Sequence, residues 1–439
     1  MTIVLKFGGT SVADAAHIRE VARIVRARLD RKPAVVVSAH SGVTDQLDRM
    51  AREAVTGNVS IAPLAERHFT VLRELGLSTD IAKPLLEQLD ALLRGIALVR
   101  ELSPRTLDHV HSFGERLSCR TVAAHFCAVG VDAFAIDAFD AGLTTDSNYG
   151  RARPLPEAEQ QIAKTLKPRK GVAVITGYIG RDSEGYVTTL GRNGSDYSGA
   201  IFGNALDAEE IQIWTDVDGV MTADPRVVPQ ARSIPVMTYE EAGELAYYGG
   251  KVLHPATIQP AVAKTIPVRV LNTRRPESQG TLIVQSVAEE PAPVTSITSR
   301  RGVALMNVQS MRMLDQSGFM ARLFDTFGRH EIVIDHIATS EVSVTLSTFG
   351  NADLEPVARE LSSIAEVTVE RNKSAVSIVG RGMRQHGDVV HRALATLHGE
   401  KIDPQLITRS ALRTSLSLIL EESEATPAVR ALHREFFKA

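Results

Sequence analysis

The sequence predicts an α/β domain with a mostly parallel sheet between layers of helices, followed by two ferredoxin-like α+β modules. Apolar strands and amphipathic helices alternate over residues 1–288, which is typical of parallel sheets. From about residue 302 the order strand, helix, strand, strand, helix, strand appears, and it begins again at residue 374. With 439 residues, the chain is long enough for two or three such domains.

The first 288 residues open with two apolar strands, 2–7 and 34–39, joined by an amphipathic helix over 13–29. This is a βαβ unit, so we expect the two strands to be parallel. Residues 62–128 carry helical periodicity and predict several consecutive helices. The remaining expected strands are 131–136, 172–178, 186–189, 211–215, 268–271 and 281–284, and the remaining helices are 195–208, 239–248 and 255–264.

The second half begins after a charged, proline-containing linker at 289–293. The first module, 302–373, has expected strands at 303–308, 332–337, 342–348 and 367–370 and helices at 318–329 and 354–364. The second, 374–439, has strands at 376–379, 405–407 and 415–420 and helices at 389–397 and 428–436. It lacks its sixth element, and we expect a strand at 294–300 to complete it.

Composition excludes several classes of function. The net charge of −3 argues against a dedicated nucleic-acid or anionic-membrane surface. The only cysteines, Cys119 and Cys127, share one expected helix and make neither a disulfide framework nor a metal site. No signal peptide or membrane-spanning run is recognisable. These features predict a cytoplasmic protein that binds neither nucleic acid nor membrane.

A glycine turn follows the first strand, in the run Lys6-Phe7-Gly8-Gly9-Thr10-Ser11. Glycines let backbone N–H groups approach a phosphate, and the following helix adds positive potential at its N-terminus. Lys6 would supply a full charge, and the Thr-Ser pair would cap the helix. The alternative is an ordinary strand-to-helix turn with a surface lysine.

A second glycine turn, Gly191-Arg192-Asn193-Gly194-Ser195-Asp196, lies between an expected strand and an expected helix, with Ser195 as a plausible N-cap. Two helix N-termini at one cleft would cradle a phosphoryl group from both sides. The alternative for Arg192 and Asp196 is a surface ion pair. No Walker A or protein-kinase signature is present, since Gly250-Lys251 is followed by Val252.

These two turns, together with Ile213-Trp214-Thr215-Asp216-Val217 and Lys251-Val252-Leu253-His254-Pro255, resemble the motifs of aspartate kinases, and in the same order. Those enzymes belong to the amino-acid kinase superfamily. The resemblance implies transfer of the ATP γ-phosphate to the side-chain carboxylate of L-aspartate, with Mg²⁺, in the first step of lysine, threonine and methionine synthesis. It also implies that the two modules are paired, interleaved ACT domains that join subunits into a homodimer or larger homo-oligomer. Because the chain stops after the second module, we expect no fused second enzyme.

The acceptor carboxylate is already ionised at neutral pH, so the reaction needs positive charge and positioning rather than a general base. By resemblance, Arg192 would hold the α-carboxylate of aspartate and Glu115 its ammonium group. Lys6 and Asp196 are the expected catalytic residues, and Ser38, Thr44 and Ser195 the further substrate contacts. His40, in the same loop as Ser38, is interpreted as a loop histidine rather than a catalyst. Asp45 stands where the family usually has asparagine.

The residues that the resemblance assigns to ATP are Lys6, Gly8, Gly9, Thr215, Asp216, Met221, Arg226, Lys251 and Val252. Met221 stands where a tyrosine is common in the family. Asp196 and Asp216 are the carboxylates expected nearest the phosphates, but the sequence assigns no metal ligand.

The first module resembles the effector site of lysine-inhibited aspartate kinases, especially over residues 339–344. A basic amino acid needs acidic partners, and Asp315, Asp335 and Glu341 could supply them. Lysine is therefore the favoured effector and threonine the second; the alternative is that the module only dimerises. The expected effector residues are Met313, Asp315, Gln316, Gly318, Phe319, Met320, Val333, Ile334, Asp335, Ser340 and Glu341.

Two rival functions are weighed against this interpretation. Another small-acceptor kinase, acting on glutamate, carbamate or a nucleotide, is disfavoured by the paired modules and by Phe113-Gly114-Glu115. A catalytically dead amino-acid sensor is disfavoured by the intact Lys6, Glu115, Arg192 and Asp196.

Overall fold

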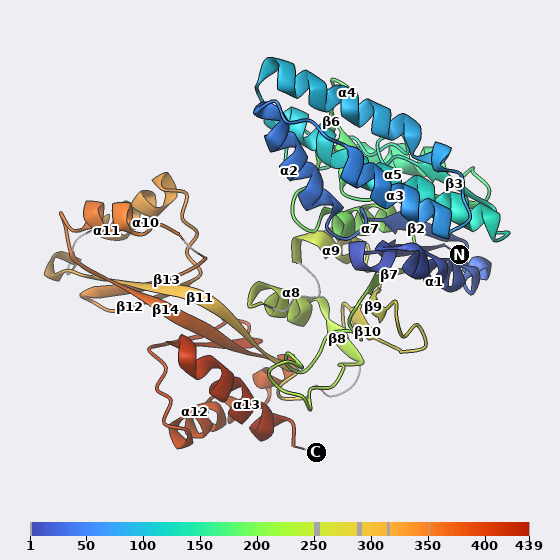
Figure 1. Cartoon of the computed structure of the whole chain (residues 1–439). Coiled ribbons are helices and arrows are strands. Elements are labelled where there is room, and N and C mark those ends of the chain that lie inside the picture. Colours follow the sequence, from blue (N-terminus) through green and yellow to red (C-terminus); the bar gives the residue numbers. More distant parts are fainter. Residues whose placement is uncertain (1, 250–254, 288–291, 314–316, 351, 439) are drawn as a thin grey trace. The chain divides into compact units, whose positions relative to one another are not determined.

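The computed structural model describes residues 2–249, 255–287, 292–313, 317–350 and 352–438 (Figure 1). The chain divides into two compact units. The first unit comprises residues 1–220, 235–239 and 252–286, and the second comprises residues 221–234, 240–251 and 287–439. Among the described residues, no helix is both long and apolar enough to cross a membrane.

The first unit is built on a sheet that has eight strands in the described residues, in the order β3-β4-β2-β1-β7-β9-β10-β8. All neighbours in this sheet are parallel except β9 and β10. The mostly parallel sheet is therefore confirmed. The strands are β1 (Ile3–Phe7), β2 (Pro33–Val37), β3 (Ala133–Ile136), β4 (Val172–Thr176), β7 (Glu210–Thr215), β8 (Val236–Thr238), β9 (Val268–Asn272) and β10 (Thr281–Val284). The short strand β8 has no counterpart in the sequence-based expectation.

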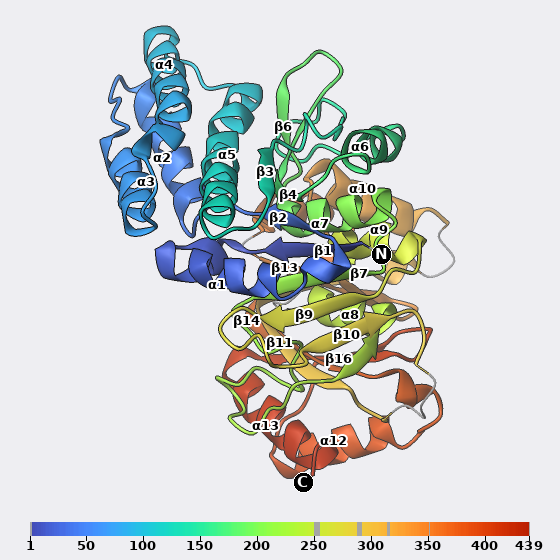
Figure 2. The same ribbon diagram turned by 90° about the vertical axis from the view of Figure 1, so that its right-hand side faces the viewer.

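Helices cover this sheet, and α2 to α5 gather into a helical layer of their own (Figures 1 and 2). The helices are η1 (Gly9–Val12), α1 (Ala15–Arg26), η2 (Leu29–Arg31), α2 (Val43–Val55), α3 (Ala62–Glu74), η3 (Thr79–Ile81), α4 (Lys83–Val99), α5 (Pro104–Ala128), α6 (Ala158–Leu166), α7 (Gly194–Ala205) and α9 (Pro255–Ala263). A separate hairpin joins β5 (Ile179–Arg181) to β6 (Val187–Thr189). The consecutive helices expected over 62–128 are α3, α4 and α5.

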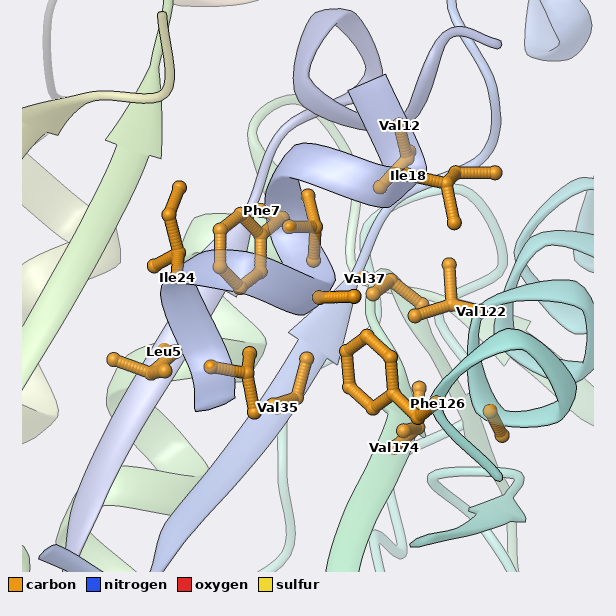
Figure 3. Close-up of a cluster of buried hydrophobic side chains, with 14 of the residues drawn as sticks. Leu5, Phe7, Val12, Ile18, Ile24, Val35, Val37, Val122, Phe126 and Val174 are labelled. Carbon is orange, nitrogen blue, oxygen red and sulfur yellow. The ribbon is translucent and has the colours of Figure 1, made fainter. Parts of the chain in front are cut away.

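One apolar core of the first unit lies between the sheet and the helices α1 and α5 (Figure 3). Leu5 and Phe7 of β1 are fully buried there against α1, in the same cluster as Phe126 of α5. Successive side chains of a strand point to opposite faces. Lys6, between those two apolar residues, therefore points to the other face of the sheet, toward Gly199 of α7.

The second unit is built on an antiparallel sheet with six strands among the described residues, in the order β12-β13-β11-β14-β16-β15. Its strands are β11 (Ser296–Gln309), β12 (His336–Thr339), β13 (Ser343–Phe349), β14 (Glu366–Val379), β15 (Leu406–Arg409) and β16 (Ser415–Glu421). Its helices are η4 (Met311–Met313), α10 (Phe319–Arg329), α11 (Glu355–Leu361), η5 (Arg381–Arg384), α12 (Val389–Gly399), η6 (Glu422–Glu424) and α13 (Ala425–Phe436). Most of α8 (Tyr239–Tyr247) belongs to this unit as well.

Strands β11 and β14 each serve both halves of this sheet. Residues 296–301 of β11 pair with residues 374–379 of β14, and residues 303–309 pair with β13 and with the first part of β14. The register shifts at Gly302, whose φ of 74° is in the region that favours glycine. The strands expected separately at 294–300 and 303–308 are thus one strand. Those expected at 367–370 and 376–379 are likewise both parts of β14.

Each half of the sheet has its own apolar core. Residues of α10 and α11 pack on Met306, Val308 and their neighbours, whereas α12 and α13 pack on Ile297, Ile378 and theirs. The arrangement of two helices over four strands, repeated once, is the expected pair of ferredoxin-like modules. The strand expected at 332–337 begins only at His336, because residues 332–335 form no ladder with β13 beyond one hydrogen bond from Asp335.

Candidate active site

A cavity of about 550 Å³ opens in the first unit at the carboxyl ends of β1 and β2. Ligands of open α/β sheets bind at this edge, where successive loops converge. The cavity brings together eight of the predicted residues from segments far apart in the sequence. Its lining residues are Lys6, Gly9, Thr10, Ser38, Ala39, His40, Ser41, Gly42, Thr44, Glu115, Gly150, Tyr178, Gly191, Arg192, Asn193, Gly194, Ser195 and Asp196.

Lys6 and Asp196 form an ion pair at the floor of this cavity. The Lys6 Nζ atom lies 2.6 Å from Asp196 Oδ1, and the two side chains are 10% and 15% exposed. Asp196 is in the first turn of α7, where the helix dipole favours a negative charge. The sequence left open a surface pair between Arg192 and Asp196; the structure pairs Asp196 with Lys6 instead.

Arg192 remains exposed at the mouth of the cavity, and no carboxylate pairs with it among the described residues. Its turn places Asn193 at the N-cap of α7 with a φ of 58°, in the left-handed conformation that asparagine tolerates. The expectation that Ser195 caps this helix is therefore wrong. Ser195 is the second residue of α7 and lines the cavity from there.

The first glycine turn brings backbone close to backbone. A Cβ atom on Gly9 would lie 2.9 Å from the Ala39 carbonyl oxygen, so no larger residue fits without a shift. Gly8 does not line the cavity, and its N–H donates to the Trp214 carbonyl at 3.2 Å. Thr10 and Ser11 were expected to cap the next helix, but they belong to η1, and Asp14 caps α1 by accepting from the His17 N–H.

Glu115 of α5 is 3% exposed and faces the same cavity. Its Oε1 atom accepts a hydrogen bond from the Ala39 N–H at 3.1 Å, and its Oε2 atom has no partner among the described residues. Burial raises the pKa of this carboxyl to about 8, although the Ala39 N–H and the Lys6 charge oppose the shift. A cationic group placed against the free oxygen would stabilise the ionised form.

Asp108, which the sequence interpretation missed, holds two of the cavity-forming segments together. Its carboxylate accepts from the Gly150 N–H at 2.9 Å and from the N–H and hydroxyl of Thr189, both at 2.8 Å. Thr189 ends β6, just before the second glycine turn. The available signal was spacing, because Asp108 precedes Glu115 by two helical turns and so lies on the same face of α5.

Tyr178 and His68 were also missed. Tyr178 lines the cavity, and its backbone has a φ of 68°. Its N–H donates to Ser198 Oγ, and burial raises the pKa of its hydroxyl to about 12. His68 packs against His40 with ring centroids 4.8 Å apart. Burial lowers the pKa of both imidazoles, to about 4 for His68. His40 is thus a neutral packing residue beside the cavity, consistent with its interpretation as a loop histidine.

The other ATP residues expected from sequence lie outside this cavity. Thr215 ends β7, and Asp216 follows it, exposed, with its carboxylate 3.2 Å from the Thr215 hydroxyl. Met221 and Arg226 belong to the second unit, where Arg226 pairs with Asp224 at 2.6 Å. Lys251 and Val252 are outside the described residues.

The expected effector residues are in the second unit, but Asp315 and Gln316 are outside the described residues. Phe319 is 3% exposed and packs in the core beneath α10 and α11, and Met313 and Met320 lie at the edge of that core. Val333 is 73% exposed, and Ile334 is half-buried. Gly318 precedes α10, Ser340 bonds Ser343 in the turn before β13, and Glu341 is exposed.

Asp335 has a partner that the sequence did not indicate. The hydroxyl of Tyr247, at the end of α8, donates to Asp335 Oδ1 within the second unit. Burial raises the pKa of the Asp335 carboxyl. Any ligand that uses this carboxylate must therefore share it with Tyr247 or displace the tyrosine.

Comparison with known proteins identifies the family. Residues 1–272 match the model of the amino acid kinase family, and residues 376–436 match that of the ACT domain. The chain is 37% identical to the chloroplastic aspartokinase 2 of Arabidopsis thaliana, over the whole chain and 85% of that protein. It is 34% identical to the lysine-sensitive aspartokinase 3 of Escherichia coli, over 99% of each.

The chain belongs to the aspartokinase family. It also resembles the solved E. coli aspartokinase III in complex with aspartate and ADP, with a TM-score of 0.84 and 31% identity over the full length of both chains. The complex of that enzyme with lysine and aspartate gives a TM-score of 0.81 at 32% identity. The expected fold class and the expected aspartate kinase activity, an ATP-dependent phosphotransfer to the aspartate side-chain carboxylate, are thereby confirmed.

Proposed function

We propose that the aspartokinase reaction takes place in the cavity around Lys6 and Asp196. The observation that carries this proposal is the buried Lys6–Asp196 pair in the same cavity as Glu115 and Arg192. Lys6 supplies a positive charge for the transferred phosphoryl group, and Asp196 positions that charge. Glu115 and Arg192 supply two opposite charges for an amino acid. An α-amino acid has both an ammonium and a carboxylate group, so the pair Glu115 and Arg192 fits it.

In the proposed mechanism, the side-chain carboxylate of aspartate is the nucleophile and no proton is removed from it. Arg192 binds the α-carboxylate, Glu115 the ammonium group, and the Ser38, Thr44 and Ser195 groups orient the reacting carboxylate. Lys6 offsets the negative charge that gathers on the phosphoryl oxygens. Asp196 holds the Lys6 ammonium group in place, so its contribution is mainly positioning.

We assign the remaining ATP contacts to Gly8, Gly9, Thr215, Asp216, Met221, Arg226, Lys251 and Val252, on the strength of the family resemblance. Mg²⁺ bound together with ATP would neutralise part of the phosphate charge. The described residues contain no group of three or more His, Cys, Asp or Glu side chains arranged for a metal. Mg²⁺ needs only one or two carboxylates beside phosphates and water; the exposed Asp216 would supply one, whereas Asp196 is paired with Lys6.

The second unit would regulate this activity. Lysine is the proposed effector, with threonine second, because the relative solved with lysine covers the whole chain and because Asp335 and Glu341 offer acidic partners. We propose domain boundaries of 1–288, 302–373 and 374–439, a cytoplasmic location, and a homodimer or larger homo-oligomer joined through the ACT-type modules. Strands β12 and β15 end the strand order of the antiparallel sheet, and pairing with a second copy would use one of them.

The substrate assignment is tested by trapping the product. With ATP, Mg²⁺, L-aspartate and hydroxylamine, we expect aspartyl hydroxamate, because an acyl phosphate reacts readily with this nucleophile. L-Glutamate and carbamate serve as competing acceptors. Hydroxamate formed from glutamate at a higher kcat/KM than from aspartate would contradict the assignment.

Arg192→Ala should mainly raise the KM for aspartate, since it removes a charged hydrogen bond that ground state and transition state share. A loss of about 1.5–3 kcal/mol corresponds to roughly 10- to 150-fold. Steady-state kinetics with each substrate varied in turn provide the measurement, with Arg94→Ala, on the exposed face of α4, as the control. A rise in the KM for ATP that exceeds the rise for aspartate would exclude the proposed role.

Aspartate binding at pH 7 should release a proton from Glu115. Its carboxyl is mostly protonated below a pKa of about 8, whereas the bound ammonium group requires the ionised form. Affinity for aspartate should therefore rise with pH and level off above about pH 8. Isothermal titration calorimetry in buffers of different ionisation enthalpy counts the released protons.

In this titration Glu115→Gln should abolish the proton release and Asp45→Asn should leave it intact. Equal proton release by the wild type and Glu115→Gln would show that another group titrates.

Glu341→Ala should weaken inhibition by lysine by about 1–3 kcal/mol, the value of one lost charged contact, and leave uninhibited turnover unchanged. Inhibition curves for lysine and threonine measure the effect, and Glu366→Ala, at the start of β14, is the control. Inhibition by threonine together with no response to lysine would show that the acidic residues were misassigned.

A further inference from the structure

A second cavity, of about 620 Å³, lies within the second unit between the segment 227–232 and the end of α13. It is as large as the cavity around Lys6 and falls in the size range of small-molecule sites. Its lining residues are Val227, Val228, Pro229, Gln230, Arg232, Arg430, His433, Arg434, Phe437 and Lys438.

The polar part of the lining is entirely basic or neutral. Four cationic side chains and no aspartate or glutamate line the cavity among the described residues. Arg434 and Lys438 pair with Glu400 and Glu435, which lie outside the lining. The guanidinium groups of Arg232 and Arg430 have no carboxylate partner in the described part of the chain.

The positions of these groups are fixed by the fold. Arg430 Nε donates to the Val227 carbonyl at 2.9 Å, and this hydrogen bond links α13 to the segment 227–232. Thr222 Oγ1 lies 3.0 Å from His433 Nε2 and also accepts from the Arg232 N–H at 3.1 Å. The segment is therefore attached to α13 at both ends, so the cavity is preformed and ligand binding would cost little ordering entropy.

The remaining wall is apolar. Val228 is 4% exposed and belongs to the core that α12 and α13 share, and Val227 and Phe437 lie at the edge of that core. The rings of Phe437 and His433 stack with centroids 4.6 Å apart and an interplanar angle of 26°. A hydrophobic surface beside two unpaired guanidinium groups is suited to a ligand with an apolar body and an acidic head.

A cavity in the first unit is also lined by several arginines, but its charge is balanced by a carboxylate. A site of about 290 Å³ in the first unit is lined by Arg28, Arg31 and Arg269. There Glu210 is part of the lining and lies within ion-pair distance of both Arg31 and Arg269. Its positive charge is already balanced, whereas that of Arg232 and Arg430 is not.

We propose that the cavity between residues 227–232 and α13 binds a small organic anion. A phosphate, sulfonate or carboxylate group would contact the guanidinium groups of Arg232 and Arg430, and the apolar body would pack on Val228 and Phe437. The site is separate from the catalytic cavity, and all of its residues belong to the second unit.

Such a ligand would also affect the reaction, a consequence that rests on the proposed function. The cavity wall formed by residues 227–232 directly follows the turn Asp224-Pro225-Arg226. The N–H groups of Val227 and Val228 both donate to the Asp224 carbonyl at 2.9 Å, which joins the wall to the turn. Arg226 is one of the proposed ATP contacts. A ligand in the cavity would contact the segment that follows Arg226, so it should change the KM for ATP and leave the KM for aspartate unchanged.

The probe for the binding test is 8-anilinonaphthalene-1-sulfonate, an aromatic anion whose fluorescence rises in apolar sites. We expect saturable binding of one probe per chain to the full-length protein, with displacement by octanoate and, more weakly, by inorganic phosphate. The double variant Arg232→Glu/Arg430→Glu should bind the probe at least about tenfold more weakly, because both charged contacts to the sulfonate are lost. Arg359→Glu, in α11, is the matched charge-reversal control.

Arg232→Gln provides a second test that does not depend on the Arg430–Val227 hydrogen bond, and it should also weaken binding. Unchanged probe affinity in both cavity variants, or equal weakening in Arg359→Glu, would overturn the proposal. So would a lower molecular mass of the double variant in sedimentation, since the surface would then be an interface with a second copy of the chain. Because probe binding requires no catalysis, a failure here is distinguishable from a failure of the proposed active site.

Discussion

The proposed active site depends on one ion pair, that between Lys6 and Asp196. An ammonium group in this position loses most of its hydration, and only a close carboxylate compensates for that loss. Removing one partner of such a pair typically costs about 3–5 kcal/mol, because the other charge is left buried. The pair therefore fixes both the end of β1 and the first turn of α7, and it joins the two glycine turns of the cavity.

Other elements of the first unit hold this pair in position. The pleat of β1 sends Leu5 and Phe7 into the apolar core (Figure 3) and Lys6 to the opposite face. Gly199 leaves room for the lysine stem beneath α7. On the other side of the cavity, α5 contributes two buried carboxylates with different roles. Asp108 is saturated by hydrogen bonds from the cavity loops, whereas Glu115 keeps one oxygen free for a ligand.

The sequence was most informative where a pattern is local. The β-branched, apolar run before Lys6 predicted β1, and the repeated order of strands and helices predicted the two modules. It failed at element boundaries: Asn193, not Ser195, occupies the N-cap position of α7, and Gly302 lets two expected strands continue as β11. The spacing of Asp108 from Glu115 was the one signal available for it, but its role depends on Thr189, just as that of Tyr178 depends on Ser198. The partner of Lys6 was likewise undecided until the fold brought Asp196 to it.

A double-mutant cycle on Lys6 and Asp196 tests the central claim most directly. We expect Lys6→Ala and Asp196→Ala each to lower kcat by about 100-fold or more, the scale of one electrostatic contact to the transition state. If Asp196 acts by holding Lys6, the double variant should be little worse than Lys6→Ala alone. Losses that multiply in the double variant would show that the two residues act independently and would contradict the account, as would wild-type turnover in either single variant.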